Sequence, residues 1–466
     1  MIAPASFGAL SPDAKQTRFY AEIVQEQVYP IRGRPAPEKG PAMPQAPHSS
    51  HSFGREDVME FQAEMKYVLD TIWLLISGAL VMWMAAGFAM LEAGMVRTKN
   101  VTAILTKNIA LYSVACIAFY LIGYNLMYGE GNAVLGSGFA LSGTSADGHS
   151  LLSDFFFQVV FVATAASIVS GTVAERVRFW PFMIFTLVLT AIIYPIQGHW
   201  TWGGTSLGGL IDGFSDFAGS TIVHSVGGWA GLAGALLLGA RKGKYDSQGN
   251  IHPMPASSLP LSTLGTFVLW LGWFGFNAGS ALAANEGAGM AMLVTHVSAA
   301  TASLTWMTIE WIKFGKPSLV GIVTGMVAGL ATITPASGFV GPLGALVYGI
   351  SAGIVCYYGV TLVKRSLKID DSLDVFAVHG VGGILGILLV AVFASPDLGG
   401  MGYAKGMTMG TQFVVQMTGT AATVIWSIIG TIVIIKIVSA LVGLRVDDEA
   451  ETDGLDLSEH GERGYN

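Results

Sequence analysis

Asp216-Phe-Ala-Gly-Ser-Thr-Ile-Val-His-Ser-Val-Gly-Gly-Trp-Ala-Gly-Leu-Ala-Gly234 is an apolar, glycine-rich stretch with one titratable side chain, His224, well inside it. Asp371-Ser-Leu-Asp-Val-Phe-Ala-Val-His-Gly-Val-Gly-Gly-Ile-Leu-Gly386 repeats the pattern around His379. Within the shared Val-His-x-Val-Gly-Gly, the copies differ only at the residue after the histidine. An aspartate, Asp216 or Asp371, lies eight residues before each histidine. The pair predicts a site or pore built from two halves.

The composition is typical of a membrane protein. Hydrophobic residues make up 52% of the chain, charged residues 12%, and the mean hydropathy is +0.58. A soluble domain has about a quarter charged residues. The 60 glycines fit a membrane bundle, because small residues let helices approach closely in lipid. Cys116 and Cys356 lie in apolar runs and predict no disulfide framework.

Apolar runs of about 20 residues predict an all-α polytopic membrane protein with eleven transmembrane helices. The expected spans are 69–91, 103–126, 153–173, 180–197, 218–239, 259–279, 290–312, 318–334, 342–362, 374–394 and 411–442. Residues 67–442 form the transmembrane domain in this interpretation. Residues 1–66 are rich in proline and polar residues and predict a disordered tail, with a short helix near residues 15–28. They show no ordinary signal peptide.

Basic residues are concentrated in alternate connections. The loops after the odd-numbered spans contain Arg97, Lys99, Arg176, Arg178, Arg241, Lys242, Lys244, Lys313, Lys316, Lys364, Arg365 and Lys368, whereas the others contain only Lys405. The positive-inside rule places the first set in the cytoplasm. The N-terminus is then outside and the tail 443–466 is cytoplasmic. The basic residues of the N-terminal tail argue weakly for the reverse, but long segments translocate largely regardless of charge.

His224 lies on the fifth expected span and His379 on the tenth. Because five is odd, the two copies cross the membrane in opposite senses, which predicts an inverted five-helix repeat with its site near the midplane. The segments 88–94 and 277–289 give a second, weaker echo of the repeat. The eleventh span has no counterpart and is expected to brace the bundle.

The simplest interpretation of a single membrane histidine is an interhelical hydrogen bond. Two at matching positions favour a shared polar passage, because ionisable residues in spans are costly and usually face a cavity or a partner. Touching imidazoles would titrate as a coupled pair. A neutral imidazole donates from one nitrogen and accepts at the other, so two would form a short polar path.

Aromatic side chains suggest a cation site. Trp202, Phe161 and Phe276, with the Ser280 hydroxyl as an acceptor, are candidates for a cation–π cage at an outer vestibule. The alternative is an interfacial aromatic belt with core packing, and we accept this alternative for Trp200 and Trp270.

The acidic residues of the spans have structural alternatives. Asp216 opens the fifth span and is either an N-cap or a carboxylate that attracts cations at the mouth, and these roles are compatible. Asp374, before His379, has the same two interpretations. Glu92 and Glu310 are expected to form structural ion pairs.

Several motifs, in the same order, resemble the ammonium transporter family (Amt/Mep/Rh), with a bacterial style of tail. They are Asp216 to Arg241, Gly272-Trp-Phe-Gly-Phe-Asn-Ala-Gly-Ser280, Gly315-Lys-Pro-Ser318, Thr334-Pro-Ala336, Asp374-Val-Phe-Ala-Val-His-Gly380 and Leu455-Asp-Leu-Ser-Glu-His-Gly461. The resemblance covers about residues 67–462. It implies a homotrimer in the cell (inner) membrane with one pore per subunit. It also implies a PII-type signalling protein as a partner at the cytoplasmic face.

The resemblance also assigns roles. Trp202, Phe161 and Ser280 match the outer recruitment site for ammonium, and Phe161 and Phe276 match its gate. In the pore, His224 and His379 match the twin histidines and Thr334 a position beside them, while Asp216 matches the carboxylate on which transport depends. Phe157 and Gln158 fall at the pore entrance. The long N-terminal tail and a longer segment between Trp202 and Asp216 depart from the family pattern.

The expected function is therefore transport of ammonium, deprotonated at the vestibule and conducted as ammonia, with a separate proton path as a hypothesis. The protein is expected to be surrounded by membrane lipid. We expect no enzyme activity, and we expect no metal, cofactor or nucleic acid to bind. Two alternatives stay open. One is an ammonium sensor, and the other is a membrane electron carrier with His224 and His379 as axial haem ligands.

Overall fold

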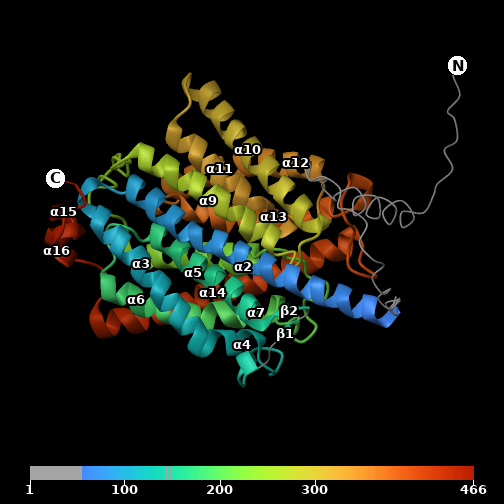
Figure 1. Ribbon diagram of the computed structural model, residues 1–466. Coiled ribbons are helices and arrows are strands. Elements are labelled where there is room, and N and C mark those ends of the chain that lie inside the picture. The colour runs from blue at the N-terminus through green and yellow to red at the C-terminus, as the bar shows by residue number, and fades with distance from the viewer. Residues whose placement is uncertain (1–54, 143–144, 147, 466) are drawn as a thin grey trace, which may run out of the picture. The chain divides into compact units, whose positions relative to one another are not determined.

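The computed structural model describes residues 55–142, 145–146 and 148–465 (Figure 1). The chain divides into two units, Met1–Glu56 and Asp57–Asn466. Most of the expected tail 1–66, with its short helix, lies outside the described residues. Residues 55–66, by contrast, are helical and continue without a break into the first span.

The first repeat half contains the helices and strands that precede residue 239. These are α2 (Arg55–Met95), η1 (Thr98–Asn100), α3 (Val101–Ala118), η2 (Phe119–Gly123), α4 (Tyr124–Tyr128), η3 (Ala140–Ser142), β1 (Ser145–Ala146), β2 (His149–Ser150), α5 (Leu151–Thr172), α6 (Phe179–Val188), η4 (Leu189–Ile193), α7 (Tyr194–Thr201), η5 (Ser220–Ser225) and α8 (Val226–Leu238). Strands β1 and β2 pair antiparallel as a short hairpin.

The second half and the C-terminal segment follow. They contain α9 (Leu259–Gly279), α10 (Glu286–Phe314), α11 (Leu319–Ile333), η6 (Thr334–Ala336), α12 (Pro342–Thr361), η7 (Leu362–Ser366), η8 (Phe376–Val381), α13 (Gly382–Phe393), η9 (Pro396–Leu398), α14 (Met409–Val442), α15 (Asp448–Asp453) and α16 (Leu455–His460). Side chains of Ser258, Asn285, Ser318 and Thr408 cap the starts of α9, α10, α11 and α14. Each accepts a backbone N–H of the first turn that has no partner within the helix.

Eleven helical segments in the described part of the chain are long and apolar enough to cross a membrane, as the sequence predicts. They are Glu56–Met95, Thr98–Tyr128, Leu151–Thr172, Phe179–Thr201, Ser220–Leu238, Leu259–Gly279, Glu286–Phe314, Leu319–Ala336, Pro342–Ser366, Phe376–Phe393 and Met409–Val442. The fold is an inverted repeat of five spans each, with α14 as an additional helix. Both cysteines are free.

Each histidine lies on a short π-helical segment, which the sequence did not predict. His224 is on η5 and His379 on η8, and each segment leads directly into an α-helix that begins with small residues. A π turn holds one extra residue, so it re-aims a side chain relative to a continuous α-helix. The same distortion in both halves directs the two imidazoles toward each other.

The two halves approach closely just after the histidines. A Cβ added to Gly228 would lie 2.5 Å from the Gly380 backbone nitrogen. The matching glycine of the other half, Gly383, is less confined, since its added Cβ would lie 3.2 Å from the Ser220 carbonyl oxygen. The copies also differ in sequence here, with Ser225 in one and Gly380 in the other. A Cβ added to Gly380 would lie 2.5 Å from a ring carbon of Phe376, on the same segment.

The eleventh span does more than brace the bundle. Helix α14 packs against α6, α8 and α13. Gln416 accepts a hydrogen bond from the Ser215 N–H at 2.9 Å and donates to the Ser215 carbonyl oxygen at 2.7 Å. Gln412 donates to the Gly213 carbonyl oxygen at 2.9 Å. Two amides one turn apart therefore fix the loop that carries Asp216.

Buried ion pairs join the loops at one end of the bundle, here called the basic end. Glu175 lies 2.9 Å from both Arg97 and Arg241, and Arg241 also pairs with Asp370 at 2.8 Å. These residues come from four different connections and both repeat halves. Although burial opposes the charge, hydrogen bonds from Arg241 and its positive charge hold the pKa of Asp370 well below its usual range. Many of the basic residues that predicted topology are thus structural as well.

The C-terminal tail docks on the same end, where Figure 1 shows α15 and α16. Glu451 accepts from Arg445 at 2.7 Å and from the Lys242 N–H at 2.5 Å. The Leu455 N–H donates to Asn100, and Asp456 accepts from the Ala103 N–H, both at 2.9 Å. The tail therefore contacts the connection between the first two spans as well as the segment after α8.

Replacing Gly228 with alanine should destabilise the protein, because the new methyl group meets a backbone that cannot rotate away. We expect a cost of about 1–3 kcal/mol, typical of overpacking. Thermal unfolding of the detergent-solubilised protein measures it. Gly383→Ala is the matched control and should lower the melting temperature less. Equal shifts in the two variants would contradict the asymmetric crossing.

Candidate functional site

The two histidines meet at the interface of the repeat halves, as predicted. Nδ1 of His224 lies 3.1 Å from Nδ1 of His379, and the ring centroids are 5.1 Å apart with planes inclined by 24°. His224 is fully buried and His379 is 4% exposed. The contact is a hydrogen bond between like groups, so one ring donates and the other accepts.

This bond sets the properties of the remaining ring nitrogens. A neutral ring that donates from Nδ1 has a bare, accepting Nε2, whereas a neutral ring that accepts at Nδ1 has a donating Nε2–H. The two Nε2 atoms therefore have opposite roles in either arrangement. Nε2 of His224 has no hydrogen-bond partner among the described residues. A buried polar atom left in this way is available to a small polar molecule.

Aromatic rings continue the row beyond His224. The Phe276 ring lies 5.7 Å from the His224 ring and 4.0 Å from the Phe161 ring, on which it stacks with an inclination of 25°. Phe161 and Phe276 are both fully buried. The two stacked phenylalanine rings therefore block the path at this point.

A cavity of about 480 Å³, here called the vestibule, lies beyond the phenylalanines at the end opposite the basic end. It is lined by Tyr124, Tyr128, Ala140, His149, Leu151, Asp154, Phe157, Gln158, Thr201, Trp202, Phe217, Ser280 and Leu282. The Trp202 ring meets the Phe161 ring edge-on at 6.0 Å. Ser280 donates a hydrogen bond to the Phe276 carbonyl oxygen at 2.8 Å. Trp202 and Ser280 thus line this cavity, whereas Phe161 is not in its lining and adjoins it through the contact with Trp202.

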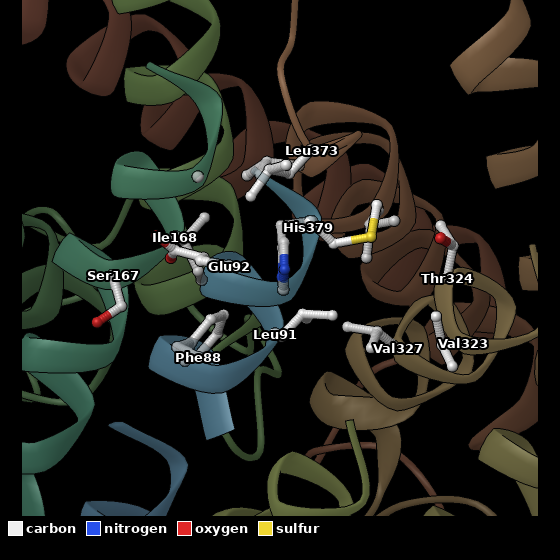
Figure 2. Close-up of a pocket in the computed structure, with 14 residues that line it drawn as sticks. Phe88, Leu91, Glu92, Ser167, Ile168, Val323, Thr324, Val327, Leu373 and His379 are labelled. Carbon is white, nitrogen blue, oxygen red and sulfur yellow. The ribbon is translucent and has the colours of Figure 1, made fainter. Parts of the chain in front are cut away.

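A second, smaller cavity of about 50 Å³ lies on the other side of the histidine pair (Figure 2). We call it the inner cavity. His379 is on its wall, together with Phe88 and Glu92 from α2, and the Phe88 ring lies 6.3 Å from the His379 ring. Most of the other side chains that line it are aliphatic. The row from vestibule to inner cavity is therefore Phe161, Phe276, His224 and His379.

Asp216 is a cap, as one of its two interpretations predicts. Its Oδ1 accepts from the N–H groups of Gly219 and Ser220 at 2.9 and 2.8 Å. Its Oδ2 accepts from the Thr221 N–H at 2.7 Å and from the Thr221 hydroxyl at 2.5 Å. Burial raises the pKa of Asp216, and these hydrogen bonds oppose the rise. With four donors bound, the carboxylate positions η5 and has little capacity left for a ligand.

Asp371 has the matching place in the other half but is less well satisfied. Its Oδ2 accepts from the Phe376 N–H at 2.7 Å, five residues on, as Asp216 does from Thr221. Its Oδ1 has no donor among the described residues. Burial and the nearby Asp374 raise the pKa of Asp371 to about 7. Asp374 pairs instead with Lys364 at 2.6 Å, so it is not the repeat equivalent of Asp216.

Thr334 reaches the histidine pair through a tryptophan. Its hydroxyl accepts from Trp273 Nε1 at 2.8 Å and donates to the Leu330 carbonyl oxygen at 2.7 Å. The Trp273 ring lies 5.2 Å from the His224 ring and nearly parallel to it, at 16°. Thr334 therefore fixes the ring on which His224 packs.

The expectation of ion pairs at Glu92 and Glu310 was wrong. Glu92 Oε2 accepts from Ser170 at 2.7 Å and from Asn108 at 3.0 Å, and no basic group in the described part of the chain lies within 4.0 Å. Glu310 accepts from the Ser318 N–H and from Trp306, and holds the start of α11. For both glutamates, the hydrogen-bond partners are neutral donors and not basic side chains.

Sequence reasoning missed Trp273, Gln412, Gln416 and Asp154. Gln412 and Gln416 are polar residues one turn apart in an otherwise apolar span, which is a usable signal. Trp273 stands in the quoted motif but was not singled out. Asp154 lies in the first turn of α5, where an acidic residue is ordinary at a helix start.

The geometry does not favour the haem alternative. Histidine–metal bonds are about 2 Å long, so two axial ligands on opposite faces of one iron hold their ligating nitrogens about 4 Å apart. The observed 3.1 Å between the Nδ1 atoms is a hydrogen-bond distance. Within the described ranges, no cluster of three or more His, Cys, Asp or Glu is placed to hold a metal.

Comparison with known proteins identifies relatives over most of the chain. The model of the Ammonium Transporter Family matches residues 72–465. A protein of Aquifex aeolicus named ammonium transporter is 42% identical, with 85% of this chain and 93% of that protein covered. One of Bacillus subtilis with the same name is 38% identical, with 85% and 98% covered.

Solved structures show the same similarity as the sequence relatives. A structure titled "Sensor Amt Protein" aligns with a TM-score of 0.81 and 34% identity, covering 85% of this chain and 99% of that one. Candida albicans Mep2 aligns with a TM-score of 0.75 and 29% identity, covering 84% and 90%. The similarity includes all eleven predicted spans except the beginning of the first.

Asp216→Asn should destabilise the protein strongly, because asparagine has one accepting oxygen and orphans donors at Thr221. Each orphaned buried donor costs about 1–3 kcal/mol.

Asp371→Asn is the matched control. Because the pKa of Asp371 is raised in the folded protein, the free energy of unfolding of the wild type should fall as the pH rises from about 4 towards 7. The Asp371→Asn change should therefore be tolerated best at pH 8. Melting temperatures at pH 5 and 8 check both; a larger loss for Asp371→Asn at pH 8 would contradict this.

Proposed function

The chain belongs to the Ammonium Transporter Family, and we propose that it recruits NH4⁺ at Trp202, Phe161 and Ser280, removes a proton, and conducts NH3 past His224 and His379. Ammonium transport itself is the property that gives this family its name, and the chain is a multi-pass membrane protein. The observation that carries the proposal is the unbroken row of Phe161, Phe276, His224 and His379 between two cavities.

The energetics favour loss of the proton before passage. A bare unit charge in an apolar lumen costs on the order of tens of kcal/mol in the idealised limit. A cation–π contact returns about 0.5–2 kcal/mol. The vestibule therefore concentrates the ion but does not carry it through. Neutral ammonia passes at lower cost, because it accepts and donates hydrogen bonds at the two Nε2 atoms of the histidine pair.

Selectivity over potassium follows from the same step. Ammonium and potassium are similar in size, so a size filter does not separate them. Ammonium has a proton to release and potassium has none. Potassium therefore stops at Phe161 and Phe276, the gate of the pore.

We propose further that the released proton crosses separately, through the histidines and bound water, so that transport is electrogenic. The Nδ1–Nδ1 hydrogen bond supports this, since it is a direct link along which a proton can move from one ring to the other. The alternative is a gas channel that passes NH3 alone. Asp216 acts in either case as a positioning residue, and Thr334 acts through Trp273. In this proposal the protein is a transporter and not an enzyme, because the proton removed from NH4⁺ rejoins NH3 on the other side and the substrate leaves unchanged.

We propose the orientation and the partners of the protein from its charge distribution and its family. The basic end faces the cytoplasm of a cell with the protein in its inner membrane, so the N-terminus is outside and residues 443–466 are inside. Ammonium and ammonia are the substrates, the subunits form a homotrimer, and a PII-type protein binds at the cytoplasmic face. Contacts of α15 and α16 with the loops at the basic end support a regulatory tail.

A sensor is the second candidate. The structure titled "Sensor Amt Protein" has a TM-score of 0.81 against this chain, so the same fold is found in a protein described as a sensor. In that case, ammonium in the vestibule changes how the docked tail binds a partner. Transport without any ligand-dependent change at the tail would exclude it.

Ammonium added to proteoliposomes containing the protein should evoke an inward current, because the proton travels with each ammonia. Solid-supported membrane recording measures it, and uptake of methylammonium on the same vesicles is the control for activity. Uptake without current would leave a gas channel as the function. Neither uptake nor current would overturn transport altogether.

Replacing either pore histidine with alanine should weaken discrimination against potassium, because the polar path that serves only a deprotonated substrate is broken. We expect potassium-evoked currents, which are negligible in wild type, to become measurable in His224→Ala and His379→Ala. His199→Ala, buried outside the row, is the matched control. Unchanged selectivity in both pore variants would argue against the histidine path.

A further inference from the structure

One carboxylate in the vestibule has no place in the proposed mechanism. Asp154 lies in the first turn of α5, is 8% exposed, and lines the same cavity as Trp202 and Ser280. An aspartate that is this enclosed is normally bonded on both oxygens. Asp154 is not.

The two oxygens of Asp154 differ in their surroundings. Oδ2 accepts a hydrogen bond from the Tyr124 hydroxyl at 2.7 Å. Oδ1 lies 3.9 Å from His149 Nε2, which is too long for a hydrogen bond. No donor from the described residues reaches Oδ1. Tyr124 therefore anchors one side of the carboxylate, while the other side is left to the contents of the cavity.

A second acceptor lies one helical turn deeper. Gln158 is 6% exposed, lines the vestibule, and its Oε1 has no hydrogen-bond partner in the described part of the chain. Residues four apart on a helix share a face, so Asp154 and Gln158 stand one above the other on α5. Phe161 follows after three more residues. The wall of the vestibule thus has two unused acceptors in a line that ends at the gate.

We propose that Asp154 and Gln158 form a cation subsite that binds ammonium or a primary alkylammonium ion before it reaches the site at Trp202, Phe161 and Ser280. Tetrahedral N–H groups suit two acceptors on one wall, with the remaining N–H groups directed at water or at the Tyr128 side of the cavity. A single negative charge in a confined mouth also raises the local concentration of monovalent cations. This inference rests on the proposed function, because it identifies how the same vestibule is loaded.

The subsite differs chemically from the aromatic one. An aromatic face attracts any compact cation through its quadrupole. A carboxylate oxygen and an amide oxygen accept directed hydrogen bonds from ammonium, although the same oxygens can also coordinate potassium. The subsite therefore loads the vestibule, and discrimination against potassium is left to the deprotonation that follows.

Asp154→Asn tests this without changing the size of the side chain, and its remaining oxygen still accepts from Tyr124. We expect the ammonium concentration for half-maximal current to rise about tenfold, at the low end of electrostatic focusing, with the maximal current within about twofold of wild type. Gln158→Met, similar in shape but without the amide, should raise it about threefold, because it removes one hydrogen-bond acceptor for the cation. If Asp154→Asn does not fold, Gln158→Met still tests the subsite.

A control separates the local carboxylate from charge in general. Glu130→Gln removes a negative charge from an exposed position in the loop after α4, outside the vestibule lining, and should have little effect. An unchanged half-saturation in Asp154→Asn and Gln158→Met, or an equal shift in Glu130→Gln, overturns the subsite. Wild-type protein that gives neither current nor methylammonium uptake overturns the proposed function instead.

Discussion

The hydrogen bond between His224 and His379 is the contact on which the rest of the structure depends. Two identical side chains share it, so only one proton can lie between their Nδ1 atoms. The bond therefore fixes the roles of both rings and places a donor and an acceptor along the path. It forms only if two helices from opposite repeat halves approach closely and turn their histidines inward. The π segments η5 and η8 provide the turn, and Gly228 and Gly380 provide the approach.

Several polar groups around the histidine pair are satisfied by the protein. Asp216 binds four donors, Gln416 holds Ser215, and Thr334 holds Trp273. Other buried polar atoms have no hydrogen-bond partner among the described residues. They include His224 Nε2 on the row and Gln158 Oε1 at its entrance, and also Asp371 Oδ1 and Gln412 Oε1 away from it. In the proposed function, the first two are the unpaired atoms that a passing solute would meet.

Much of this could be predicted from sequence. Hydropathy predicts the eleven spans, and one repeated motif predicts that two histidines meet in an inverted repeat. Capping chemistry predicts that Asp216 binds the first turn of its helix. Three features could not be predicted. No residue pattern distinguishes a π turn from an α turn at His224. The start of α2 at Arg55 lies in a polar segment without a hydropathy signal. The partners of Glu92 are neutral residues on other helices, and their positions depend on packing.

The inverted repeat explains the pair of histidines but not the direction of recruitment. Asp216 and Asp371 occupy equivalent positions, yet the first binds four donors and the second leaves one oxygen unbonded. The two cavities differ even more, because the vestibule is about 480 Å³ with aromatic rings and a carboxylate, whereas the inner cavity is about 50 Å³ and mainly aliphatic. The repeated motif therefore supplies the histidine contact, and residues outside that motif make its two sides differ. In the proposed function, the vestibule is the side where aromatic rings and a carboxylate come together beside the row, so a cation is recognised there and not at the symmetric contact itself.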